Sequence, residues 1–133
     1  MRHGTSWCRA VLLGLAVMGW LLSAETAVAQ IVIGLAGPMT GDNASFGNQL
    51  RTGAETAIDD INNAGGIKSM GGAKLKLIEY DTQDSAEKAK DSAQRMLAQE
   101  PNLVGGFGCG LSTFTLAVTE VTERAGLPWL TLS

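Results

Sequence analysis

The sequence has 133 residues, a length that allows one domain and is too short for a two-domain protein. Lys and Arg number 10 and Asp and Glu number 13, and a net charge of -3 argues against a nucleic-acid partner, which needs clustered basic residues. Hydrophobic residues make up 45% and charged residues 17%, a composition that supplies a core and excludes a disordered chain.

The first 29 residues are predicted to be an export signal. Two arginines, Arg2 and Arg9, precede an uninterrupted apolar stretch at 11–22, which is shorter than the roughly 20 residues that span a bilayer. The segment ends in Ala27-Val28-Ala29, the small-x-small pattern that signal peptidase recognises. We therefore expect a signal peptide over 1–29 and a mature chain from 30 to 133, with a membrane anchor or a buried helix as the alternative.

Cleavage after Ala29 leaves few groups that could support catalysis. It removes His3 and Cys8, which are the only histidine and one of the two cysteines. Without histidine the chain cannot build a Ser-His or Cys-His pair or a His-containing zinc site, and Cys109 alone cannot form an internal disulfide. We therefore expect no enzyme activity, no catalytic residue, no metal ligand and no cofactor.

The mature chain begins with a predicted strand, loop and helix. Residues 31–35 are apolar and β-branched, which is typical of a strand buried on both faces. Residues 37–47 are dense in turn formers and predict a loop. Apolar residues then recur at helical spacing over 50–61, with Asp59-Asp60 on the outer face, and Gly65-Gly66 supplies a left-handed end to that helix.

A second strand and helix follow. Residues 75–78 predict a strand that ends at Tyr80-Asp81. Small and apolar residues repeat at helical spacing over 86–97. Asp84 or Ser85 is the predicted cap of this helix, and Pro101 ends it.

The last predicted elements are a strand, a helix and the start of another strand. Residues 103–107 predict the third strand, although Gly105 and Gly106 weaken it unless a neighbouring backbone comes close. The third helix is expected over 115–125, stopped by Gly126, and residues 128–132 begin a fourth strand.

This alternation predicts an α/β fold with a doubly wound, mostly parallel sheet. For the common strand order 2-1-3-4, a ligand lies beyond the carboxyl ends of the strands, where the order reverses between strands one and three. The loops 37–47 and 108–113 would then face the ligand. The fourth strand would form an uncovered apolar edge, which invites aggregation.

The loop 108–113 is the best candidate for a binding site. It places the hydroxyls of Ser112 and Thr113 at a helix start, where backbone N–H groups and the helix dipole favour an anion such as a carboxylate. Ser and Thr are also common caps, so an ordinary helix cap is the alternative. Phe46 in the other loop is either a lid residue or part of the core.

A nucleotide site is the competing interpretation of the glycine-rich turns. The sequence has no G-x-x-x-x-G-K-[ST], and 34–37 does not fit G-x-G-x-x-G. Asp81 stands where a dinucleotide fold places its ribose-binding acid, and Asp81 with Asp84 could pair as acids or metal ligands, but a turn or cap role fits both. Cys109 is expected to be packed, because nothing basic adjoins it to lower its pKa.

A family resemblance rests on residues 52–67, which read TGAETAIDDINNAGGI. With this segment the chain resembles the periplasmic leucine/isoleucine/valine-binding family, the type I substrate-binding proteins of ABC transporters. Segments 33–41, 75–81 and 120–128 agree in the same order, and the match covers essentially all of 31–133. The resemblance implies a type I periplasmic-binding-protein lobe, of which this chain is the first half only.

The resemblance also implies which residues bind. The family holds a small zwitterion between two lobes that close, and its carboxylate-binding serine falls on Ser112, with Thr113 after it. Phe46 matches an aromatic loop position, commonly Tyr, and lacks the hydroxyl, so any hydrogen bond made there is lost. The expected ligand-binding residues are Phe46, Gly110, Leu111, Ser112 and Thr113.

Other features of the relatives are missing. Their Ala-x-Thr ligand loop, hinge and second lobe have no counterpart, so we expect residues 30–133 alone to bind amino acids weakly or not at all. Some relatives join the strand-three loop to the second helix by a disulfide, but residues 84–85 contain no cysteine to pair with Cys109.

The resemblance implies a monomeric periplasmic protein that binds a branched-chain or similar amino acid and delivers it to an inner-membrane ABC permease. A ligand-sensing domain of the same fold, an exported α/β enzyme and a non-functional truncated remnant are the alternatives.

Overall fold

A computed structural model describes residues 30–132, and the expected signal peptide lies outside this range. The strands are β1 (Gln30–Gly37), β2 (Lys74–Asp81), β3 (Leu103–Gly108) and β4 (Trp129–Thr131). The helices are α2 (Ala44–Asn63), α3 (Ala86–Gln99) and α4 (Ser112–Arg124), with the short 3-10 helix η1 (Lys68–Met70). Within the described range, no helix is both long enough and apolar enough to cross a membrane.

The four strands form one parallel sheet in the order β2-β1-β3-β4, which confirms the predicted topology. The central strand β1 is the most buried, and Leu35 and Ala36 within it have no exposed surface. The register sets Gly37 beside Asp81 and Ala36 beside Gly108. The carboxyl ends of β1, β2 and β3 therefore meet at one edge, and the strand order reverses there between β1 and β3.

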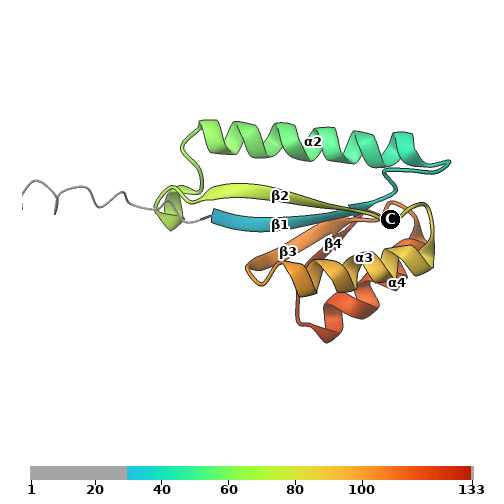
Figure 1. Cartoon of the computed structure of the whole chain (residues 1–133). Helices are drawn as coiled ribbons and strands as arrows, with labels where there is room; N and C mark the ends of the chain where they lie inside the picture. Colours follow the sequence, from blue (N-terminus) through green and yellow to red (C-terminus); the bar gives the residue numbers. More distant parts are fainter. Residues whose placement is uncertain (1–29, 133) are drawn as a thin grey trace, which may run out of the picture.

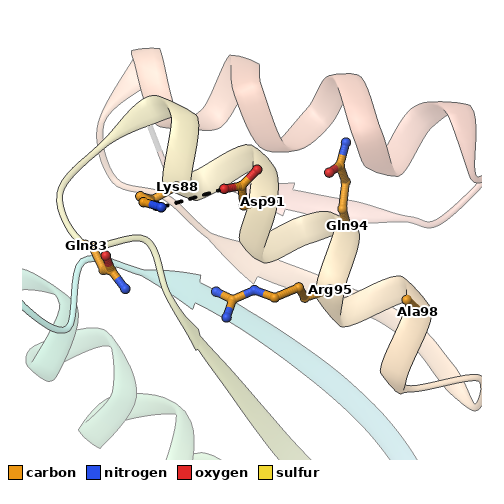
Figure 2. Close-up of a pocket in the computed structure, with 6 residues that line it drawn as sticks. All are labelled: Gln83, Lys88, Asp91, Gln94, Arg95 and Ala98. Carbon is orange, nitrogen blue, oxygen red and sulfur yellow. Dashed lines mark ion pairs between the residues drawn. The ribbon is translucent and has the colours of Figure 1, made fainter.

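The main core lies between the sheet and the helices α3 and α4 (Figure 1). Small side chains on α3 allow a close approach, and a Cβ added at Gly34 of β1 would lie 2.3 Å from Sδ of Met96. The outer flank of α3 carries polar side chains (Figure 2). The buried residues of this core are Val32, Ala36, Ile78, Ala89, Ala93, Met96, Cys109, Phe114 and Val118.

The strand β3 tolerates its glycines because neighbouring residues come close to it, which is the condition that the sequence sets for this strand. A Cβ added at Gly106 would lie 2.3 Å from the Trp129 ring and 2.8 Å from the backbone oxygen of Gly34. The predicted helix ends are also confirmed, since Gly65 and Gly126 have φ of +104° and +67° after α2 and α4.

The opposite face of the sheet is covered by α2, which contacts β2 and β1 (Figure 1). Asp59 and Asp60 lie on its exposed side, as predicted. Val104 and Leu130 on the other half of the sheet are 55% and 66% exposed. The strand β4 therefore forms the uncovered apolar edge that the sequence predicts.

Candidate functional site

The end of β1 and the segment that follows β3 touch at the carboxyl edge of the sheet. The backbone N–H of Cys109 donates to the carbonyl of Ala36 at 2.9 Å. Gly108 has φ +134°, and a Cβ added there would lie 2.0 Å from the same carbonyl oxygen. Only glycine satisfies both the conformation and the space at this position. The end of β1 and the segment that leads into α4 are thus held against each other by their backbones.

Phe46 lies close to this contact, in a helix and not in the predicted loop. The helix α2 begins at Ala44, so the loop predicted for 37–47 is wrong over its last four residues. The sequence predicts Gly47 as a turn former, whereas the residue is needed for packing, because a Cβ there would lie 2.1 Å from the carbonyl oxygen of Pro38. Phe46 therefore sits in the first helical turn.

The ring of Phe46 rests directly on Gly110. A Cβ added at Gly110 would lie 2.0 Å from Cε1 of Phe46, so a larger residue at Gly110 would displace the ring. The side chain is 38% exposed, so one part is packed and another part faces solvent at the strand-end edge. The structure brings together two of the five residues that the sequence assigns to the ligand.

The remaining three expected ligand-binding residues, Leu111, Ser112 and Thr113, lie at the start of α4. This helix begins at Ser112, three residues before the predicted start, and Leu111 occupies the cap position without a side-chain cap bond. The prediction of Ser or Thr as an ordinary cap is therefore wrong. Ser112 and Thr113 are exposed residues of the first turn, where backbone N–H groups have no acceptor within the helix. The arrangement can accept an anion.

Internal bonds fix the segment that leads into α4. The hydroxyl of Thr115 donates to the carbonyl of Cys109, and the Cys109 thiol lies 3.5 Å from the carbonyl oxygen of Ala36. Cys109 has φ +57° and no exposed surface, which confirms its packing role. Burial raises the pKa of the Cys109 thiol to about 12.

The burial of the Cys109 thiol can be tested by its reactivity. In a Cys8→Ser variant, where only Cys109 can react, we expect a disulfide-exchange reagent at pH 8 to leave the folded protein unmodified, because the thiol is inaccessible and protonated. In urea the same thiol should react completely. Absorbance of the released chromophore measures both states, and rapid labelling without urea would contradict the burial of Cys109.

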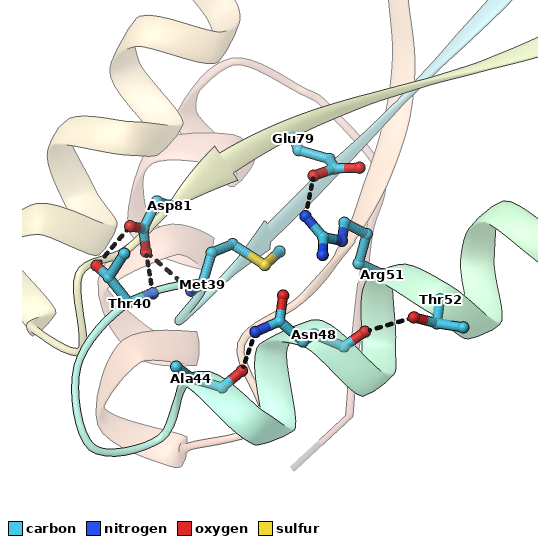
Figure 3. A network of polar contacts seen from close by, with 8 residues as sticks. All are labelled: Met39, Thr40, Ala44, Asn48, Arg51, Thr52, Glu79 and Asp81. Atoms are coloured by element: carbon cyan, nitrogen blue, oxygen red, sulfur yellow. Dashed lines mark hydrogen bonds and ion pairs between the residues drawn. The ribbon is translucent and has the colours of Figure 1, made fainter.

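Asp81 holds the start of the β1–α2 loop (Figure 3). Its carboxylate accepts hydrogen bonds from the backbone N–H groups of Met39 at 2.9 Å and Gln83 at 2.8 Å, and from the hydroxyl of Thr40 at 2.6 Å. Burial raises the pKa of Asp81, but the bonds from Thr40, Gln83 and Met39 outweigh it and hold the pKa below its usual value. Asp81 is a turn residue, which confirms one of the two predicted roles.

Asp84 holds the other end of the same loop. Its two carboxylate oxygens accept from the Asn43 amide at 2.9 and 3.0 Å. Ser85, the other candidate, caps α3 by accepting from the N–H of Lys88 at 3.4 Å. Both aspartates therefore position the loop that carries α2 and Phe46. The sequence alone does not identify Thr40 and Asn43 as their partners, because these residues lie about 40 positions earlier in the chain.

One further contact joins α2 to the sheet beside this loop. Arg51 lies 3.9 Å from the carboxylate of Glu79 on β2 (Figure 3). Burial raises the pKa of Glu79, and the Arg51 charge opposes this rise. The first half of α2, which carries Phe46, is thus tied to β2 by its loop and by this ion pair.

A model for a family described as "Periplasmic binding protein" matches residues 30–133. Among curated relatives, an "Amino acid binding protein" of Pseudomonas aeruginosa is 41% identical over 120 residues, which cover 90% of this chain and 31% of the relative. The "Leucine-, isoleucine-, valine-, threonine-, and alanine-binding protein" of the same species is 33% identical over 133 residues, which cover 100% of this chain and 34% of the relative.

A solved structure gives a similar result. The substrate-binding protein of a branched-chain amino acid transporter from Streptococcus pneumoniae, in complex with isoleucine, superposes with a TM-score of 0.70 at 26% identity. The similarity covers 77% of this chain and 28% of that protein. The chain thus spans about a third of the length of the curated relatives it matches.

Proposed function

The chain belongs to the periplasmic binding protein family, and from this premise we propose that it is part of the extracytoplasmic substrate-binding component of an ABC transporter. The proposed ligand is a branched-chain or similar small amino acid, in line with the ligands named for two relatives. The observation that carries this proposal is the exposed start of α4 beside Phe46, at the point where the strand order reverses.

We propose that the ligand carboxylate is the group held by this chain. The N–H groups of Ser112 and Thr113 and their two hydroxyls can donate to it, and the positive end of the α4 dipole favours its charge. The Phe46 ring and Leu111 offer apolar surface to the rest of the ligand. The ring makes no hydrogen bond there, because it lacks a hydroxyl. This is binding without chemical conversion.

The remaining steps of the proposal involve other parts of the protein. A second lobe would close over the ligand and supply the opposite wall, and the closed, monomeric receptor would deliver the ligand to an inner-membrane permease after export by the signal at 1–29. With one wall alone, residues 30–133 should bind amino acids weakly. Calorimetry that shows micromolar affinity for this segment alone would contradict the need for a second wall.

The carboxylate role is tested by a comparison of leucine with leucinamide, which lacks the carboxylate. In an NMR titration of the purified chain, leucine should shift the amide signals of Ser112 and Thr113, and leucinamide should not. Ser112→Ala should weaken the response to leucine about tenfold, because it removes one hydrogen bond to a charged group. The control is Ser69→Ala, an exposed position in η1.

The outcomes of this titration separate the parts of the proposal. Equal shifts with leucinamide would overturn the assignment of the carboxylate to α4. Affinity can be examined further by replacing the matching third of the 41% identical Pseudomonas protein with residues 30–133. Calorimetry on that two-lobed hybrid should show tight binding of an amino acid, and failure of every amino acid to bind a folded hybrid would count against the transport function.

A further inference from the structure

A second hollow lies along the outer flank of α3, on the side of the helix that borders the edge strand β2 (Figure 2). Its volume is about 480 Å³. None of the five residues assigned to the amino-acid site lines it. The lining residues are Gln83 from the β2–α3 turn and Lys88, Asp91, Gln94, Arg95 and Ala98 from one stripe of α3.

Arg95 is an exposed cation of this hollow that contacts two neighbouring side chains. Its guanidinium lies over the Tyr80 ring, 5.9 Å from the ring centroid, and donates to the hydroxyl of Ser92 at 3.4 Å. The Tyr80 hydroxyl is in turn fixed by its bond to Gln99 at 2.7 Å. Across residues 30–132, Arg95 forms no ion pair with a carboxylate. Its planar fork of donors therefore lacks the acidic partner that it fits best.

The other polar groups complete an anion-binding arrangement. Gln83 has φ +49° in a turn fixed by the bond from its N–H to Asp81, and its amide extends toward the guanidinium of Arg95 (Figure 2). Lys88 and Asp91 are 3.9 Å apart and about half exposed, so their ion pair is weak and exchanges readily with other partners. Two cations and one carboxylate leave the hollow positive in a chain whose net charge is -3.

We propose that this hollow is a second binding site, which takes a small dicarboxylate. One carboxylate of the ligand pairs with the fork of Arg95 and the Gln83 amide, and the other draws Lys88 away from Asp91. The site shares no residue with the amino-acid site at the start of α4.

The proposal is tested by an NMR titration of the purified chain with succinate at constant ionic strength. Saturable shifts are expected at Gln83, Gln94 and the guanidinium N–H of Arg95. Arg95→Gln should weaken binding about tenfold or more, since it removes a charge-assisted pair of hydrogen bonds. The control is Arg124→Gln, an exposed arginine of α4 whose partner is Glu120, and it should leave succinate binding unchanged.

Two further arms define the ligand and separate this site from the first. Monomethyl succinate should bind more weakly than succinate in the parent protein, and the two should bind alike in Lys88→Gln. Ser112→Ala should leave the succinate shifts intact, so this experiment tests the second site separately from the amino-acid site. Shifts of equal size in Arg95→Gln, or shifts that sodium chloride alone reproduces, would overturn the proposal.

Discussion

Gly108→Ala is expected to lower the free energy of unfolding by about 3 kcal/mol, since it combines a forbidden backbone conformation with a clash against fixed backbone. The residue has φ +134°, and the added methyl group would lie 2.0 Å from the carbonyl oxygen of Ala36. That carbonyl belongs to the buried strand β1 and accepts the N–H of Cys109, so it cannot move aside without breaking the contact between β1 and the segment that leads into α4. Urea unfolding followed by circular dichroism measures the loss.

The matched control is Gly53→Ala, which adds the same methyl group in the interior of α2. Nothing lies within 4 Å of the position that its Cβ would take. This substitution should raise the free energy of unfolding by about 0.5–1 kcal/mol, because alanine restricts the unfolded chain and favours the helix. Similar unfolding curves for the two variants would show that the close approach at Gly108 does not matter for stability.

Asp81→Ala should lower the free energy of unfolding at pH 7 by about 2 kcal/mol, since it leaves the N–H groups of Met39, Thr40 and Gln83 without their charged acceptor. The folded protein holds the pKa of Asp81 below its ordinary value of 3.8. A lowered pKa means that the carboxylate stabilises the fold above pH 3.8, and that this stabilisation is lost as the pH falls through the lower, folded-state value.

The pH dependence therefore gives the sharper measurement. Unfolding curves of the parent protein and of Asp81→Ala should differ fully at neutral pH and converge below pH 3.8. Asp59→Ala, on the exposed side of α2, is the matched control for the loss of a carboxylate. A constant difference between the parent and Asp81→Ala down to pH 2 would contradict the charged role of Asp81.

The sequence predicts the strands and their order well, because a parallel sheet requires short apolar runs that do not depend on distant details. Residues 31–35 and 103–107 both fall within observed strands, and the order 2-1-3-4 is confirmed. The starts of α2 and α4 were missed for a common physical reason. Both first turns lie at the carboxyl edge, where exposed residues such as Ser112 stand beside a single packed residue, Gly47 in α2 and Phe114 in α4, so no apolar period marks the start of the helix.

The contacts that shape the site are harder to predict from sequence. Asp81 meets Met39 and Thr40, and Asp84 meets Asn43, only because β1 and β2 pair in one particular register. Gly110 is small because the Phe46 ring occupies the space beside it. Local turn chemistry identifies each of these residues as a turn former, but it does not identify the distant partner.

The strand order also has a consequence for how the protein is made. Among the described residues the first strand to leave the ribosome is β1, which lies inside the sheet between β2 and β3. The core on the α3 and α4 side includes Phe114 and Val118, so it cannot close until translation has passed those positions. Such long-range pairing folds slowly. The residues that precede Phe114 therefore leave the ribosome before their core can form.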